Sequence, residues 1–397
     1  MQSTEFVIVG CGPAGGTAAR EAARAGVETV VLERDAVVGA KRVCAAGLRP
    51  GFCAEFHLPR SIVHLDPPSI ALHTAGGRRY DFTLGPAHTT TREELDGAIG
   101  DSARHEGAAI RTNCLYRGYR RDGEDVIVEY ADYAAGERKT IRARALFLAQ
   151  GSTACLNDGA FAFPAWAKGL ITCYQYRVYP ERPALAQTYQ TLEMHYYRSA
   201  HDRPVIGWMF PKRDHLSIGL GIQAKVAGDE LRATLDDFLA RVQARLFPGV
   251  PYRVQTEGAL LYGGKPRPRI EDERVMLGGT AAGLVDATTG EGIYEAASSG
   301  RFAAAAVARM RSGAPAPGAA YARALKQAFY RRLHHRQKLM SFLEERPARF
   351  DVLFSQLAAT PRFADLLQRD RNSIALRDRL YLYGQAARFG LRALFVA

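Results

Sequence analysis

The order of apolar and polar positions at the start of the chain predicts a strand, a glycine-rich turn, a helix and a second strand. Residues 6–9 are apolar throughout, which is typical of a strand buried on both faces. A glycine-rich turn follows at 10–16, and an alanine-rich helix is expected over 17–25, because Gly26 ends it. The next apolar run, 29–32, continues what reads as the opening of a βαβ unit.

Further along, helical and strand-like stretches follow one another. We expect a helix over 91–107, a half-exposed strand over 126–130, where apolar and polar residues alternate, and a buried strand over 145–149. The region 173–261 is rich in Tyr and Thr and contains strand-like pieces such as 216–220. The character of the chain therefore changes in its middle part.

One amphipathic helix interrupts this middle region. Its apolar face is formed by Leu231, Leu235, Phe238, Leu239, Val242 and Leu246. The buried-strand pattern then resumes at 274–277 and runs into a second glycine-rich turn and a helix of small residues over 292–309. An Ala/Pro/Gly stretch at 313–319 resembles a linker, and the residues after 321 read as helical to the end.

Length and composition limit the class of protein. A chain of 397 residues suggests two or three packed units, and 47% hydrophobic with 24% charged residues is an ordinary globular composition. The first strand starts at Phe6, which leaves no room for a signal peptide, and no run of about 18 apolar residues indicates a transmembrane helix. We therefore expect a cytoplasmic protein.

The cysteines point to a reducing compartment. They are Cys11, Cys44, Cys53, Cys114, Cys155 and Cys173. None forms a C-x-x-C pair, and their scatter argues against a disulfide framework and against a zinc site. We expect free thiols and no metal.

The charge balance indicates an anionic partner. Lys and Arg number 53 against 41 Asp and Glu, a net charge of +12, and many basic residues lie after position 300, as in 331–338. No nucleic-acid module is recognisable, so we expect an anionic substrate or a membrane surface rather than nucleic acid. A solvated helix face is the simpler alternative for the basic cluster.

The turn after the first strand carries a dinucleotide-binding fingerprint. Residues 10–15 read G-C-G-P-A-G and match G-x-G-x-x-G. Gly10 makes the tight turn, Gly12 lets a pyrophosphate approach the backbone, and Gly15 allows the helix to pack closely. Glu33 ends the second strand, where an acid accepts hydrogen bonds from a ribose. No second fingerprint opens another βαβ unit, so we favour FAD over a nicotinamide cofactor.

Two later segments follow a longer pattern. Residues 278–293 resemble G-D-A-A-G-x-x-x-P-x-x-G-E-G-I of the geranylgeranyl reductase family, and the helix at 299–304 carries its S-G-x-x-A-A. Residues 41–48 are similar to the family loop K-x-C-G-G-G-L, and 207–212 to the end of Y-x-W-x-F-P. Residues 91–96 resemble the segment whose arginine lies along the flavin. The family is similar in fold to p-hydroxybenzoate hydroxylase.

The fingerprint and the resemblance, which covers about residues 1–310, together imply the residues of the site. FAD would contact Gly10, Gly12, Pro13, Ala14, Gly15, Glu33, Arg34, Cys44, Ala45, Arg92, Gly151, Gly279, Thr280, Gly290, Gly292 and Ile293. The reaction would involve Cys44, Gly290, Glu291 and Gly292. The substrate would contact Ile206, Trp208, Phe210 and Pro211.

Three positions depart from the family pattern. Thr280 replaces the acid of the G-D turn, Gln150 replaces that of a D-G turn, and Ile206 stands at the tyrosine of Y-x-W-x-F-P. Thr280 can still hydrogen-bond a ribose hydroxyl, but two charges are lost. A weakened FAD site, and with it a non-catalytic relative, stays open.

The resemblance implies reduction of isolated C=C bonds in an isoprenoid chain on a lipid, pigment or quinone, with electrons from NADPH or reduced ferredoxin. Reduced flavin carries a hydride at N5, and the helix that starts at 290–293 suits the negative charge near N1. Trp208 and Phe210 are candidates to line an apolar tunnel, although large aromatics are more often plain core. Cys44 and Glu291 are possible proton carriers, and the sequence does not identify the proton donor.

The expected fold is α/β with mixed α+β character. We expect a discontinuous Rossmann-type FAD-binding domain over 1–70, 88–172 and 262–318, and an inserted antiparallel-sheet substrate domain over 71–87 and 173–261. Residues 319–397 form a C-terminal helical region. Its basic amphipathic helices suit peripheral contact with a membrane surface, and docking onto the protein's own core is the alternative.

Rival functions remain at this point. An FAD-dependent aromatic monooxygenase shares the fold, but the G-E-G-I and W-x-F-P segments count against it. An electron-transfer flavoprotein commonly carries an iron–sulfur module, for which the cysteines are not clustered. A flavin-free binding protein is the third alternative.

Overall fold

The computed structural model divides into two compact units, each built from three stretches of the chain. It describes residues 2–40, 43–83, 87–152, 159–182, 188–223, 226–368 and 375–394. Unit 1 comprises Met1–His64, His88–Cys173 and Glu257–Gln337, and unit 2 comprises Leu65–Ala87, Tyr174–Thr256 and Lys338–Ala397. The C-terminal helices are thus shared between the two units, with the division at residue 337.

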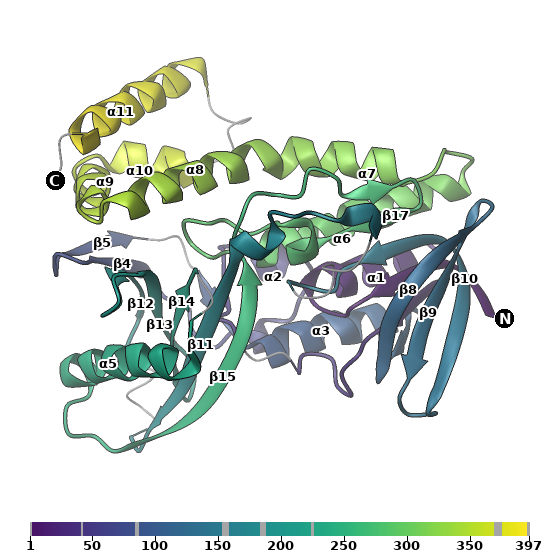
Figure 1. The fold of residues 1–397 in the computed structure, drawn as a ribbon, viewed down its shortest axis with the longest axis horizontal. Helices are drawn as coiled ribbons and strands as arrows, with labels where there is room; N and C mark the ends of the chain where they lie inside the picture. Colours follow the sequence, from purple (N-terminus) through teal and green to yellow (C-terminus); the bar gives the residue numbers. More distant parts are fainter. Residues whose placement is uncertain are drawn as a thin grey trace. The chain divides into compact units, whose positions relative to one another are not determined.

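Unit 1 is built on a mainly parallel sheet (Figure 1). Its strands are β1 (Gln2–Val9), β2 (Thr29–Leu32), β7 (Ala109–Arg111), β8 (Cys114–Asp122), β9 (Asp125–Asp132), β10 (Glu137–Leu148), β16 (Glu271–Asp272) and β17 (Val275–Leu277). The parallel strands run in the order β7-β2-β1-β10-β17, while β9 pairs antiparallel with the first half of β10. Separately, β3 (Gly47–Leu48) pairs with β6 (His88–Thr89).

The predicted strands of unit 1 are confirmed, but β1 begins at Gln2 rather than Phe6, and β10 is much longer than predicted. The apolar run predicted over 145–149 is only the end of β10, which begins at Glu137. The first half of β10 contains four charged residues and has exposed positions, so its pattern did not show a buried strand. Because the parallel part of the sheet is buried on both faces, only that part appears as a continuous apolar run.

Small residues let the helices of unit 1 pack closely. The helices are α1 (Pro13–Arg24), α2 (Phe52–Glu55), α3 (Arg92–His105), α6 (Ile293–Arg311), α7 (Gly318–Leu325) and the start of α8 (Arg331–Glu345). A Cβ on Gly300 of α6 would lie 2.2 Å from the Ala14 carbonyl oxygen, and one on Gly16 would lie 2.6 Å from Ile99 Cγ2 of α3. Helix α1 starts at Pro13, earlier than predicted, because proline is well tolerated in a first helical turn.

Unit 2 contains a seven-stranded sheet in the order β15-β11-β14-β13-β12-β4-β5. The strands are β4 (Ser69–Thr74), β5 (Arg79–Thr83), β11 (Leu170–Pro180), β12 (Thr191–Arg198), β13 (Pro204–Pro211), β14 (Leu216–Ile222) and β15 (Tyr252–Tyr262). The pairs β4–β5, β12–β13 and β13–β14 are antiparallel, but β4 and β12 are parallel. The inserted sheet is therefore not antiparallel throughout.

Helix α5 (Gly228–Leu246) lies against one face of this sheet (Figure 1). Its buried residues are Leu231, Leu235, Phe238, Leu239 and Val242, which confirms the predicted apolar face. Helix α9 (Ala348–Ala359) packs near β4 and β5, where Asp351 accepts hydrogen bonds from Thr74 Oγ1 at 2.8 Å and Tyr80 Oη at 3.0 Å. Helices α10 (Pro361–Gln368) and α11 (Leu376–Leu394) follow.

The structure gives no sign of a membrane-spanning element in the part of the chain it describes. None of the helices there combines the length and the apolar character needed to cross a bilayer.

Candidate functional site

The fingerprint glycines of unit 1 form a turn that other residues do not fit. Gly10 has a φ of +90°, and a Cβ there would lie 2.7 Å from the Ala149 carbonyl oxygen. A Cβ on Gly15 would lie 1.9 Å from the Gly10 carbonyl oxygen. The turn between β1 and α1 is therefore tight, as the fingerprint predicts, and it lies against the segment that follows β10.

The turn presents the N-terminus of α1. Gly12 precedes the helix, and no side chain of a described residue caps its first turn. The first N–H groups of a helix have no partner within the helix and carry partial positive charge, which favours a phosphate. Pro13 and Ala14 belong to the first turn of this helix.

Glu33, which directly follows β2, stabilises this turn through hydrogen bonds. Its Oε2 accepts a hydrogen bond from the Cys11 N–H at 2.7 Å, and its Oε1 accepts one from the Asp35 N–H at 3.0 Å. Arg34 is 61% exposed and lies 3.6 Å from Asp35. The Glu33 carboxylate thus lies beside the fingerprint turn, whereas the Arg34 side chain is mostly in solvent.

Arg92 and Cys44 meet next to the fingerprint turn. Arg92 is buried at the start of α3 and donates to Asp96 Oδ1 at 2.9 Å and Oδ2 at 2.5 Å. Its Nη2 lies 3.4 Å from the position of a Cβ on Gly12, and it hydrogen-bonds with Cys44. Burial opposes the charge of Arg92, but the Asp96 carboxylate outweighs it, so the pKa of Arg92 lies above its ordinary value.

The loop that carries Cys44 has an unusual backbone. The Ala46 N–H donates to Cys44 Sγ at 3.3 Å, and Ala46 has a φ of +46°, in the left-handed region that favours glycine. Ala45 precedes it, and the first two residues of the motif, Lys41 and Arg42, lie outside the described residues.

The segment after β17, which contains Gly279 and Thr280, lies next to the start of α1. Gly279, after β17, has a φ of +57°, and a Cβ there would lie 3.2 Å from Ala14 Cβ. The Gly279 N–H donates to Ser299 Oγ of α6 at 3.0 Å, and the half-buried Thr280 follows. Gly151, with a φ of +80°, follows the segment against which Gly10 packs. Residues far apart in the sequence therefore surround the start of α1.

The G-E-G-I segment forms the N-terminus of α6. The Gly290 N–H donates to the Asp286 carbonyl at 2.8 Å, and the Glu291 N–H donates to Thr289 Oγ1 at 3.2 Å. Gly292 precedes the helix, which begins at Ile293, and no described side chain caps it. A second helix N-terminus is thus open to negative charge.

A cluster of charged residues, which was not predicted from the sequence, connects the G-E-G-I segment with Arg49, five residues after Cys44. Arg49 lies 3.2 Å from Glu291 Oε1 and 3.3 Å from Glu295 Oε1, and Arg332 also contacts Glu295. Glu295 is 1% exposed. Its place in the first turn of the helix that follows the G-E-G-I segment was the available signal.

Glu295 gives a prediction on pH. Burial and the charge of Glu291 raise its pKa from 4.5 to about 7, against the opposing effect of Arg332 and Arg49. Between those pH values the folded protein binds more protons than the unfolded chain, so rising pH lowers the free energy of unfolding. The stability difference between wild type and Glu295→Gln should fall by about 1–3 kcal/mol from pH 4.5 to 7, measured by urea unfolding. A difference that grows with pH would show that the arginines keep Glu295 ionised.

In unit 2, three of the four predicted substrate contacts share one face of β13. Val205 and Met209 pack in the core with α5, so the alternating residues Ile206, Trp208 and Phe210 lie on the opposite face. Trp208 Nε1 donates to Gln175 Oε1 at 2.9 Å. Pro211 is buried at the end of the strand.

Sequence comparison relates the chain to isoprenoid reductases. It is 30% identical over 333 residues to geranylgeranyl diphosphate reductase from Oryza sativa, covering 76% of this chain and 65% of that protein. It is 28% identical over 315 residues to digeranylgeranylglycerophospholipid reductase 1 from Methanopyrus kandleri, covering 75% of this chain and 79% of that protein. The chain spans just under two thirds of the plant relatives, 66% for the tobacco protein and 65% for the rice protein. No protein-family model matches it.

Structure comparison gives the fold. A geranylgeranyl bacteriochlorophyll reductase-like protein from Thermoplasma acidophilum aligns with a TM-score of 0.78 and 21% identity, covering 96% of both chains. A flavin-dependent brominase aligns with a TM-score of 0.73 and 18% identity, covering 92% of both chains. The chain is therefore similar in sequence to proteins named as geranylgeranyl reductases, and it shares its mixed α/β fold with flavin-dependent enzymes.

Proposed function

We propose that the protein is an FAD-dependent reductase that saturates isolated C=C bonds of an isoprenoid chain carried by a lipid, a pigment or a quinone. The observation that carries this proposal is the convergence of four distant segments on the start of α1. They are the fingerprint turn, the Cys44 loop, Arg92 and the Gly279 segment. The relatives at 28–30% identity are named as reductases of geranylgeranyl compounds, which supports the substrate class.

The residues of unit 1 fit an FAD molecule. Positions where a side chain would meet backbone, such as Gly10 and Gly15, are glycines, and the α1 N-terminus they expose suits a pyrophosphate. Glu33 and Thr280 would bind ribose hydroxyls, and Cys44 would lie near the ring system. The other proposed contacts are Gly12, Pro13, Ala14, Arg34, Ala45, Arg92, Gly151, Gly279, Gly290, Gly292 and Ile293. When bound, reduced FAD supplies a hydride.

The remaining roles fall to the protein's own side chains. The α6 N-terminus after Gly290 and Gly292 would stabilise negative charge. Cys44, Glu291 and the buried Glu295 are the acids near the segments that would hold the cofactor, and burial raises the pKa of Glu295 to about 7. The exposed parts of Ile206 and Trp208 offer an apolar surface for an isoprenoid chain.

An anaerobic experiment tests the proposal. The purified protein should show a flavin spectrum, accept electrons from dithionite, and then be reoxidised by geranylgeranyl diphosphate or a geranylgeranyl lipid, yielding a product with two more hydrogen atoms for each reduced bond. NADPH and reduced ferredoxin are then compared as donors. Reduced flavin that ignores prenyl compounds, but reacts rapidly with oxygen when an aromatic substrate is present, would indicate a monooxygenase instead. A protein without flavin would contradict the proposal.

We further propose that α11 contacts an anionic membrane surface, in keeping with a lipophilic substrate. Leu376, Leu380, Tyr383, Leu391 and Leu394 are each more than half exposed. At 3.6 residues per turn they fall within an arc of about 80°. The buried residues of α11 lie on another face, and the exposed side chains of Arg377 and Arg379 flank the apolar stripe, with Arg388 and Arg392 further round the helix.

A vesicle-binding experiment tests this membrane contact. Leu391→Glu should weaken co-sedimentation with phosphatidylserine vesicles by about tenfold or more, because it replaces apolar contact with repulsion. Ala386→Glu adds the same charge to an exposed position outside the stripe and should change binding much less. Equal loss in both variants would indicate simple charge repulsion, and no binding by the wild type would contradict the proposal.

A further inference from the structure

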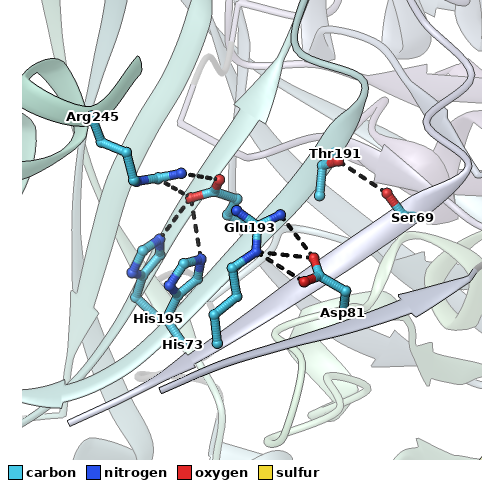
Figure 2. A network of polar contacts seen from close by, with 8 residues as sticks. Ser69, His73, Asp81, Thr191, Glu193, His195 and Arg245 are labelled. Atoms are coloured by element: carbon cyan, nitrogen blue, oxygen red, sulfur yellow. Dashed lines mark hydrogen bonds and ion pairs between the residues drawn. The ribbon is translucent and has the colours of Figure 1, made fainter. Parts of the chain in front are cut away.

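Two histidines and a glutamate converge in unit 2, where the proposed function assigns no role. His73 of β4 and His195 of β12 are direct partners in the parallel pairing of these strands. Glu193 precedes His195 by two residues, so its side chain lies on the same face of the sheet. Figure 2 shows both imidazole rings pointing toward the Glu193 carboxylate.

The distances in this cluster match those between ligands of one metal ion. His195 Nε2 lies 3.1 Å from Glu193 Oε2, and His73 Nε2 lies 3.5 Å from the same oxygen. One atom from each of the three residues lies within 4.8 Å of the other two. Two ligands bound at 2.0–2.2 Å to an ion with tetrahedral or octahedral angles are about 2.9–3.5 Å apart. The two distances from Glu193 are therefore compatible with one ion, and the stacked imidazole rings must rotate before both Nε2 atoms can point at it.

The protein holds the three side chains in place without closing the cluster off. The two imidazole rings stack at 4.0 Å with an interplanar angle of 6°, and Phe238 of α5 meets the His195 ring edge-on at 4.8 Å. Ala71, the partner of Glu193 on β4, is small and leaves room. The side chains of His73 and His195 are 17% and 15% exposed, so the cluster is not sealed in the core of the unit.

One polar atom in the cluster is not satisfied. His73 Nε2 is buried and makes no hydrogen bond with any residue that the structure describes. Its nearest charged neighbour is Glu193 at 3.5 Å, a distance typical of two ligands rather than of a good hydrogen bond. A buried imidazole nitrogen that faces a carboxylate and another imidazole is well placed to bind a cation.

Arg245 of α5 is the remaining charged neighbour of the Glu193 carboxylate. Its Nη1 donates to Glu193 Oε1 at 2.8 Å, and its Nη2 contacts Oε2 (Figure 2). A ligating carboxylate is usually hydrogen-bonded through its other oxygen, which orients it toward the metal. Arg245 can serve Oε1 in this way while Oε2 binds an ion, although its charge opposes a second cation nearby. Binding must therefore overcome this repulsion.

We propose that His73, Glu193 and His195 form a binding site for one divalent transition-metal ion of the zinc class. Two imidazoles and one carboxylate suit such an ion, whereas Mg²⁺ and Ca²⁺ prefer oxygen ligands throughout and softer ions prefer thiolates. Three protein ligands leave at least one coordination position for water or another oxygen ligand. The site is independent of the proposed reductase activity.

Calorimetry on the full-length protein tests the site directly. After chelator treatment, titration with Zn²⁺ should show saturable binding of one ion per chain. His195→Gln and Glu193→Gln should each weaken that binding by about 100-fold, because each removes one of three ligands. His201→Gln is the matched control, since His201 is exposed in the turn after β12, and it should bind like the wild type.

Crystals of the wild-type protein soaked in Zn²⁺ give a second measurement that does not depend on the folding of any variant. An anomalous difference peak within about 2.2 Å of His73 Nε2, His195 Nε2 and Glu193 Oε2 is the expected result. Absence of saturable binding by the wild type would overturn the proposal and leave a closed network of hydrogen bonds and ion pairs. Binding that persists unchanged in both ligand variants, or a peak elsewhere, would overturn it as well.

Discussion

Replacing Gly15 with alanine is expected to remove bound flavin and to destabilise unit 1. The new Cβ would lie 1.9 Å from the Gly10 carbonyl oxygen, a backbone atom of the same tight turn, so the turn must open. We expect a loss of about 3 kcal/mol in the free energy of unfolding and less than about a tenth of the wild-type flavin content. Urea unfolding and the visible spectrum of the purified variant measure the two effects.

Gly97→Ala provides the matched control. Gly97 lies within α3, and a Cβ there would have no atom within 4 Å among the described residues. Alanine favours a helix interior over glycine, so this variant should keep its flavin and gain about 0.5–1 kcal/mol. If Gly15→Ala keeps both its flavin and its stability, then the turn is not the tight one described here.

The second large effect is expected for Arg267→Met. Arg267 is 1% exposed in unit 1, where its Nε donates to the Ala281 carbonyl at 2.9 Å and its Nη1 donates to the Phe161 carbonyl. The guanidinium also lies 4.1 Å from the centre of the Trp166 ring. Methionine fills similar space but leaves buried carbonyls unsatisfied, so we expect a loss of about 2–5 kcal/mol in urea unfolding.

Two further substitutions show whether hydrogen bonding by Arg267 is the cause. Arg267→Lys should recover little, because one ammonium group does not reproduce the fork of donors on a guanidinium. Arg269→Met, two residues away, removes an exposed arginine that pairs with Asp272 and should cost less than about 1 kcal/mol. Similar losses in Arg267→Met and Arg269→Met would contradict this explanation.

The parts of the fold that follow local patterns were predictable from the sequence. The parallel strands β1 and β2 and the buried face of α5 have hydrophobic periods that depend on their own residues alone. The first half of β10 was not predictable, because its stability comes from pairing with β9 rather than from burial on both faces. The parallel pairing of β4 with β12 joins segments more than 100 residues apart and leaves no local signal.

The candidate site also contains residues that the sequence could predict and residues that it could not. The fingerprint glycines are a contiguous motif whose backbone geometry is encoded locally, so Gly10, Gly12 and Gly15 were found at once. The contacts of Arg49 with Glu295 depend on two segments about 250 residues apart, and those of His73 with His195 on the register of two strands. Neither juxtaposition follows from spacing along the chain.

The close packing of α1 against α6 has a consequence for the synthesis of the protein. A Cβ on Gly300 would lie 2.2 Å from the Ala14 carbonyl oxygen, yet nearly 290 residues separate the two positions along the chain. At about 5–20 residues per second, a ribosome needs roughly 15–60 s between the two. During that interval the nascent α1 can pack against α3 but not against α6, and the proposed cofactor site lacks the Gly279 side. Flavin would therefore bind late, and the unfinished chain is expected to rely on chaperones until the last third of unit 1 has emerged.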